Sequence, residues 1–251
     1  MDINGGPFSD PNDRDAMNLG TSVVKEGEPL GLLYGRVATG IIKTQAQLEA
    51  AREEFSLWTI FDPYLNLGDI AYEYEDGFWK EDVIGHATPD FFGGYTNTIN
   101  WNRFTLTALF TFSYGNDLIY QKDVSDSGMS SLANRGTRVL NHYSEDNTSS
   151  NRPRSMWATT YMLSSLNVYD ASYLKLKTLS LSYNLPESIC RKVRIKSASV
   201  YGTATNVFTI TSYPGPDPEV SDDPTSVIGG GRDVSTYPTV KSYTFGIRIN
   251  F

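Results

Sequence analysis

The side chains of this chain most suited to catalysis are carboxylates, and five of them are candidates for an acid and base pair: Asp69, Glu73, Asp76, Asp217 and Glu219. A glycoside hydrolase needs two carboxyl groups set about 5–10 Å apart across a cleft. A chain with 29 acidic residues always offers such pairs, and nothing in the sequence ties any two of them together. We therefore expect no catalytic residue and no enzymatic activity. The Asp217-Pro218-Glu219 segment is interpreted instead as ordering its loop through Asx-type turns.

Metal and cofactor chemistry is not indicated either. The single cysteine, Cys190, excludes an intramolecular disulfide, and His86 and His142 are far apart, with no second His or Cys at ligand spacing. We expect no metal and no cofactor.

Trp58, Trp79 and Trp157 have two interpretations: they stack on sugars, or they anchor their own loops. Substrate-binding residues therefore stay unknown.

Nucleic acid is excluded as a partner by charge. The formal net charge is −8, and phosphate backbones are bound through clustered cations. The one basic cluster, at 191–196, is interpreted as a solvated turn.

No apolar stretch is long enough for a transmembrane helix, and the first residues lack the features of an export signal. If the chain acts in an outer membrane, we expect it to be a piece of something longer or a truncated reading frame.

The elements that hold these residues are predicted to be strands, because Gly, Ser, Thr and Asn are frequent and aromatic residues make up 13% of the chain. The last nine residues alternate strictly between apolar and polar or small side chains. In a β-strand the apolar members share one face. This face, which we expect to touch lipid, consists of Tyr243, Phe245, Ile247, Ile249 and Phe251. A strand of about 9–11 residues spans the hydrocarbon of an outer membrane.

Further strands are predicted upstream. Residues 91–114 form a hairpin around a turn at 101–103, residues 173–185 and 195–211 form a second pair, and the last strand runs from about 237 to 251. Residues 31–42 are also predicted as a strand, 44–55 as a helix capped by Thr44, and 130–142 as a second short helix.

One strand changes its phase, because Leu174 and Leu176 are even-numbered whereas the apolar residues from Leu179 onward are odd-numbered. Two explanations are open. A bulge lies near Thr178, or Lys175 and Lys177 point outward above the apolar band and reach lipid head groups. We favour the second.

The connections between these strands alternate in length. More than fifty residues separate the hairpin from the second pair and about two dozen precede the last strand, whereas the other turns are short. Outer-membrane barrels have short periplasmic turns and long extracellular loops. The pattern predicts an antiparallel transmembrane β-barrel segment of about five or six strands, with short helices in its long extracellular loops and Phe251 at the periplasmic end. The rival hypothesis is a soluble all-β module that binds carbohydrate, and a third is a truncated reading frame without activity.

Several segments, in order, resemble the C-terminal barrel region of SusC/RagA-like TonB-linked outer-membrane proteins of Bacteroidetes. They include Gly27 to Ile41, Gly68 to Tyr72, Ile84 to Tyr95, Phe110 to Asp117, Ala171 to Pro186, Asn206 to Thr211, Asp217 to Glu219 and the terminal strand. The resemblance divides the chain into a loop or truncated upstream strand region at 1–26 and the C-terminal part of the barrel at 27–251.

This resemblance implies a plugged barrel of about 22 strands. It would import oligosaccharides or peptides in the outer membrane of a Gram-negative bacterium, together with a SusD-like surface lipoprotein. The TonB system would act through an N-terminal part that has no counterpart here. Phe251 resembles the terminal signal that barrel-assembly machinery recognises. The family's cation-binding loop is replaced here by Glu73 to Asp82, which lacks the order of carboxylates that a hard cation needs.

Overall fold

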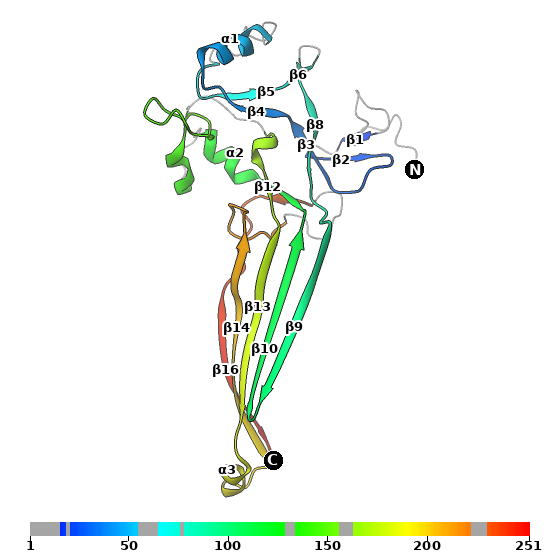
Figure 1. The fold of residues 1–251 in the computed structure, drawn as a ribbon, viewed down its shortest axis with the longest axis vertical. Helices are drawn as coiled ribbons and strands as arrows, with labels where there is room; N and C mark the ends of the chain where they lie inside the picture. Colours follow the sequence, from blue (N-terminus) through cyan, green and yellow to red (C-terminus); the bar gives the residue numbers. More distant parts are fainter. Residues whose placement is uncertain are drawn as a thin grey trace. The chain divides into compact units, whose positions relative to one another are not determined.

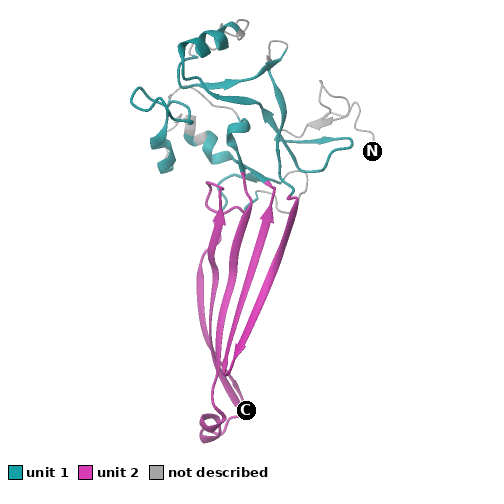
Figure 2. Ribbon diagram, viewed as in Figure 1, with its two compact units in different colours: residues 1–88, 117–169, 220–236 teal, residues 89–116, 170–219, 237–251 magenta. Residues whose placement is uncertain are grey.

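The computed structural model describes residues 16–18, 21–54, 65–75, 78–128, 134–155, 163–221 and 230–251. Trp58, Asp76 and Trp157 lie outside this range, so their predicted roles stay predictions. The chain divides into two compact units, shown in Figure 2. Unit 1 consists of residues 1–88, 117–169 and 220–236, and unit 2 of residues 89–116, 170–219 and 237–251.

Unit 2 is built on one antiparallel sheet of five strands in the order β16-β14-β13-β10-β9 (Figure 1). The strands are β9 (Phe91–Trp101), β10 (Phe104–Tyr114), β13 (Tyr173–Asn184), β14 (Ser197–Thr211) and β16 (Ser242–Asn250). Their antiparallel pairing and their lengths, from 9 to 15 residues, match the predicted barrel segment. The all-β class is thereby confirmed.

Short connections lie at one end of this sheet. β9 and β10 are joined by Asn102 and Arg103, and Asn102 adopts the left-handed conformation, with φ of 55°, that Asn tolerates better than most residues. β13 and β14 are joined through the helix α3 (Glu187–Lys192). At the other end, the chain between β10 and β13, and between β14 and β16, contributes to unit 1. This is the predicted alternation of short and long connections.

The phase change in β13 is produced by a bulge, so the favoured explanation for Lys175 and Lys177 was wrong. Thr178 pairs with Leu109 and Leu176 pairs with the next residue, Phe110, so Lys177 is the extra residue of β13 opposite β10. Lys175 is only 1% exposed. The bulge keeps the apolar residues on both sides of it on one face, whereas Lys175 takes the opposite face and binds carboxylates there.

Unit 1 contains short strands in several small sheets. β1 (Ala16–Asn18), β2 (Ser22–Lys25), β3 (Leu32–Arg36) and β8 (Glu81–His86) form one; β4 (Ala38–Ile41) pairs with β5 (Ile70–Tyr72), and β6 (Tyr74–Glu75) with β7 (Phe78–Trp79). β11 (Asp117–Tyr120) lies between β12 (Val168–Asp170) and β15 (Arg232–Asp233). The predicted strand at 31–42 is thus divided at Val37 into β3 and β4, which belong to different sheets.

The helices of unit 1 agree only partly with the prediction. α1 (Gln45–Glu54) begins directly after the predicted cap, Thr44, whose hydroxyl accepts a hydrogen bond from the Gln47 amide at 3.2 Å. Residues 130–133 of the short helix expected at 130–142 lie outside the described residues, and the described part contains the 3-10 helix η1 (Thr137–Asn141). The helix α2 (Gln121–Gly128) was not predicted. A further 3-10 helix, η2, covers Ser165–Asn167. None of the helices in the described residues has the length and apolar character needed to cross a membrane.

Small apolar clusters form the core of unit 1. One contains Val23, Leu32 and Tyr34, and another contains Ile41, Ile70 and Tyr143. Near the second, Asp69 accepts two hydrogen bonds from the Arg154 guanidinium, at 2.6 and 2.9 Å. This bidentate pair joins segments that are 85 residues apart in the sequence.

Candidate functional site

The apolar face of the five-stranded sheet is the largest feature of unit 2 that needs a functional explanation. The register brings one apolar row from every strand to this face, for example Leu106 beside both Ile99 and Leu181. Many of its large side chains are exposed, although they are hydrophobic. Among the described residues of unit 2, this sheet forms a single layer without a second sheet against it. An exposed apolar surface of this extent marks an interaction site.

The terminal strand supplies the most exposed part of this face. The row predicted to touch lipid is uncovered in the described chain, with exposures of 69% for Tyr243, 82% for Phe245, 68% for Ile247, 47% for Ile249 and 83% for Phe251. Small residues of β14 lie opposite it, since Gly202 pairs with Phe245 and Ala204 with Tyr243. A shallow apolar hollow lies over these small residues.

Aromatic side chains gather at both ends of the apolar face. At the end with the short connections, the Phe104 ring lies 6.3 Å from that of Trp101 and 4.8 Å from that of Tyr183, measured between centroids. At the other end, the Phe91 and Tyr114 rings stack at 5.0 Å. Transmembrane β-barrels have such aromatic girdles at the two membrane interfaces, with aliphatic residues between them.

The opposite face of the sheet is polar. Hydroxyl and amide groups pair across neighbouring strands: Thr98 with Thr107, Asn100 with Thr105, Ser180 with Thr203, and Thr205 with Ser242. The separations lie between 2.6 and 3.3 Å. The sheet therefore has an apolar face and a hydroxyl-rich face. Strands of a transmembrane β-barrel have this arrangement, with apolar residues toward lipid and polar residues toward the lumen.

A buried charge cluster lies on the polar side of β13. The Lys175 ammonium donates to Asp217 at 3.0 Å and to Glu219 at 2.5 Å, and Tyr173 donates to Glu219 at 2.9 Å. Asp217 also accepts hydrogen bonds from the Thr239 amide and hydroxyl and from the Glu219 amide. The last of these is the predicted Asx-type turn. The cluster fixes the connection between β14 and β16 onto the sheet.

The protonation of this cluster argues against acid–base catalysis. Burial alone would raise the pKa of Asp217, but hydrogen bonds from Thr239 and from the Glu219 amide, and then Lys175, lower it below its ordinary value. The pKa of Glu219 is lowered in the same way, because Lys175 and Tyr173 outweigh the effect of burial. A glycoside hydrolase needs one carboxyl group whose pKa is raised. These two carboxylates, both held ionised, do not supply it.

The other described candidates, Asp69 and Glu73, lie in unit 1 and have charged partners of their own. Asp69 is occupied by Arg154, and Glu73 lies 3.0 Å from the Lys80 ammonium. The Arg36 guanidinium lies over the Trp79 ring at 3.9 Å, which makes Trp79 an anchor within its own region. In the described residues no group of three or more His, Cys, Asp or Glu side chains has the geometry to hold a metal ion.

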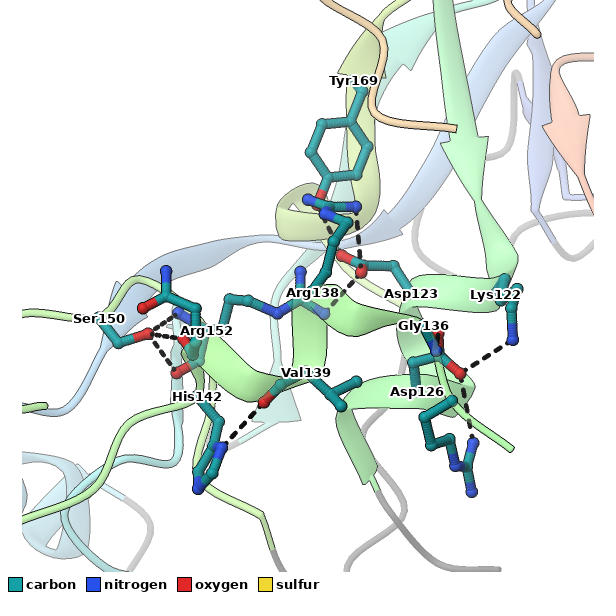
Figure 3. A network of polar contacts seen from close by, with 12 residues as sticks. Lys122, Asp123, Asp126, Gly136, Arg138, Val139, His142, Ser150, Arg152 and Tyr169 are labelled. Carbon is teal, nitrogen blue, oxygen red and sulfur yellow. Dashed lines mark hydrogen bonds and ion pairs between the residues drawn. The ribbon is translucent and has the colours of Figure 1, made fainter. Parts of the chain in front are cut away.

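Unit 1 contains a second polar network that sequence reasoning missed, drawn in Figure 3. Asp123 accepts hydrogen bonds from Arg152 at 2.7 Å, from Arg138 at 3.4 Å and from the Tyr169 hydroxyl at 2.6 Å. Burial, followed by the hydrogen bond to Asp123, raises the pKa of Tyr169. One helical turn further, Asp126 pairs with Lys122 and Arg135. No motif links these residues in the sequence, because the contacts join segments up to 46 residues apart.

Comparison with known proteins decides the family. The chain is 31% identical over 236 residues to TonB-dependent receptor P3 of Formosa agariphila, a match that covers 92% of this chain and 23% of that protein. The chain is homologous to part of a SusC/RagA-like TonB-dependent receptor. TonB-dependent receptor P26 of the same organism is 26% identical over 266 residues, which is 100% of this chain and 26% of that protein. No family model matches.

Solved structures give the same fold. The structure of the RagAB peptide importer in the closed-closed state matches with a TM-score of 0.68 and 25% identity, over 94% of this chain and 25% of that one. The open-open state gives 0.67 and 24% identity, over 94% and 24%. The chain therefore spans about a quarter of the length of the receptors that it matches. TonB-dependent receptors are outer-membrane proteins of Gram-negative bacteria, and Formosa fits the predicted Bacteroidetes group.

Proposed function

We propose that the five strands of unit 2 form the C-terminal wall of an outer-membrane TonB-dependent nutrient importer. The observation that carries this function is the uncovered apolar face bounded by aromatic residues at both ends, with hydroxyl-bearing residues on its reverse. In hydrocarbon every backbone amide must be paired within the protein, which a closed barrel achieves. The likeness to receptors and to a peptide importer supports this assignment and favours a role other than catalysis.

The proposal fixes the orientation of the strands. The apolar row from Tyr243 to Phe251 touches lipid, the short connections and Phe251 lie at the periplasmic end, and the long connections lie outside the cell. Phe251 serves as the assembly signal for the barrel-assembly machinery.

The described sheet cannot close by itself. Its edge strands, β9 and β16, each pair with one neighbour among the described strands. In a bilayer both edges require further strands. We therefore propose that transport needs the remainder of a receptor, through which the TonB system acts, and a SusD-like surface lipoprotein as partner. The cargo is an oligosaccharide or a peptide.

The rival function, a soluble module that binds carbohydrate, predicts that a second β-layer covers the apolar row. The exposed fractions of Phe245, Ile247 and Ile249 do not support it.

The test is to place single cysteines on the two faces of β16. Cys190 is first replaced by serine, and cysteines are then introduced at Phe245 and Ile247 or, as matched controls, at Thr244 and Arg248. The full chain is held in detergent micelles that contain nitroxide-labelled phosphatidylcholine, because its open edges forbid insertion into a bilayer without further strands, and the cysteines are labelled with an environment-sensitive dye. Dyes at 245 and 247 should be quenched by lipid-borne nitroxides, and dyes at 244 and 248 by aqueous iodide.

Equal access of aqueous iodide to both sets of positions would overturn the proposed wall. Flux through vesicles containing this chain alone would overturn the proposed need for the rest of a receptor.

A further inference from the structure

Unit 1 contains a cavity of about 290 Å³ that the proposed wall does not use. Its lining combines apolar side chains with polar groups that come from separate segments: Asp123, Arg138, Asn151, Arg152, Asn167 and Tyr169. Apolar walls with a few convergent polar groups are typical of small-molecule sites. All of these residues belong to one compact unit.

Two cationic side chains and one anionic side chain line this cavity. Two guanidinium groups, those of Arg138 and Arg152, face one carboxylate, that of Asp123. Both oxygens of Asp123 are occupied, one by the two arginines and the other by the Tyr169 hydroxyl. Asp123 therefore positions both guanidinium groups at the cavity.

Aromatic rings fix the more exposed of the two arginines. The Arg138 guanidinium carbon lies 5.5 Å from the Tyr169 ring centroid and 5.9 Å from that of Tyr120. The Arg138 side chain is 38% exposed, compared with 13% for Arg152. The guanidinium donates to Asp123 and to the Tyr169 hydroxyl at 3.4 Å each, and its further N–H groups suit a carboxylate, which a guanidinium binds in a bidentate manner. The Asn151 and Asn167 amides add neutral hydrogen-bonding groups to the wall.

We propose that this cavity binds a carboxylate group of the transported cargo, with Arg138 as the principal contact. This inference rests on the proposed function and narrows the cargo to anionic molecules. Two sources share that chemistry, the C-terminal carboxylate of a peptide and the carboxylate of a uronic acid. The volume accommodates one terminal residue or one sugar rather than a long chain.

The experiment measures binding to the full chain in detergent micelles by isothermal titration calorimetry. Two pairs of probes are used, each an acid and its neutral counterpart. The first pair is N-acetyl-alanyl-alanine and the same peptide with a C-terminal amide, and the second is glucuronate and glucose. One acid should bind at least tenfold more tightly than its neutral counterpart, and the acid that does so identifies the source. Arg138→Gln should weaken that binding at least tenfold. Arg138→Lys keeps the charge but loses the bidentate geometry of the guanidinium, so its affinity should lie between that of the original chain and that of Arg138→Gln.

The matched control is Arg135→Gln. Arg135 pairs with Asp126 at 3.5 Å, next to the network, and its side chain is 13% exposed, as is that of Arg152, but it does not line the cavity. Its removal should leave acid binding within twofold of the original value. Circular dichroism shows whether each variant has folded.

Three outcomes would overturn the inference: no binding of any probe, equal binding of acid and neutral probes, or equal loss in the Arg135 and Arg138 variants. None of these depends on membrane insertion or flux. The cavity can therefore fail while the proposed wall stands, and the wall can fail while the cavity binds a carboxylate.

Discussion

The two units of this chain treat hydrophobic and charged groups in opposite ways. In unit 2 the large apolar side chains of one face are exposed, and a buried lysine lies on the polar side of the sheet. Unit 1 buries small apolar clusters such as Ile41, Ile70 and Tyr143 and joins distant segments through ion pairs. The comparison teaches that one chain can follow two rules of burial: unit 1 buries its apolar groups, and unit 2 exposes them on a face that the proposed function assigns to lipid.

The largest expected effect comes from Lys175→Met. Removing the ammonium leaves Asp217 and Glu219 buried without their cation, which costs about 3–5 kcal/mol. Hydrogen exchange of β13 amides in detergent micelles, followed by mass spectrometry, measures the loss.

Lys177→Met is the matched control for this change. Lys177 also contacts Glu219, at 3.3 Å, but its side chain is 44% exposed, so its loss should cost at most about 1 kcal/mol. Similar losses of stability in both variants would show that the burial of Lys175 does not increase its contribution to the free energy of unfolding.

The second prediction tests the outward face of unit 2. Phe245→Lys places a cation in the apolar row, and a cation at the middle of a bilayer costs about 2–4 kcal/mol. Thr244→Lys changes the neighbouring position on the polar face and should cost far less. Urea titrations in detergent micelles compare the two variants, with Trp101 kept as the single tryptophan after Trp58, Trp79 and Trp157 are replaced by phenylalanine, so that fluorescence reports on unit 2. If the two lysines cost the same, Phe245 does not face lipid.

The third prediction concerns acid. Because the pKa values of Asp217 and Glu219 are lowered in the folded chain, the unfolded chain takes up their protons first as the pH falls. The stability that the cluster contributes is therefore complete above the unfolded values of about 4 and is lost as the pH drops through the folded values below them. The loss should be smaller than in Lys175→Met, because neutral carboxyl groups can still form hydrogen bonds.

Exchange of β13 amides between pH 6 and pH 2.5 measures this loss. In Lys175→Met the acid dependence should flatten, because the main cation is gone. An unchanged dependence in that variant would assign the effect to other groups.

Much of unit 2 was predictable because its information is local. Alternation between neighbouring residues indicated the row from Tyr243 to Phe251, and it located β9 and β10 to within a few residues. The phase change in β13 was assigned wrongly to outward-facing lysines, because a change of phase looks the same whether a strand gains a residue, as it does at Lys177, or a lysine turns outward. Only the partners of Lys175, 42 and 44 residues away, settle the matter.

Unit 1 was less predictable for the same physical reason. α2 has little apolar periodicity to reveal it, and Asp123 acquires its role from arginines and a tyrosine that lie 15 to 46 residues further along the chain. The one helix predicted accurately, α1, has a signal within four residues, a Thr44 cap followed by Gln47.

That local signal gives the smallest prediction. The Thr44 hydroxyl accepts from the Gln47 amide, and the Gln47 side chain accepts from the Thr44 amide at 3.0 Å, a reciprocal capping box. Thr44→Ala removes half of it and should cost about 1 kcal/mol. The loss should appear as faster exchange of the first-turn amides of α1, while β13 is unchanged.

Gln45→Ala, which removes only an exposed contact with Glu49, should cost no more than about 0.5 kcal/mol. If Thr44→Ala also accelerates exchange in β13, the two units unfold together, and the contrast between them does not extend to their stability.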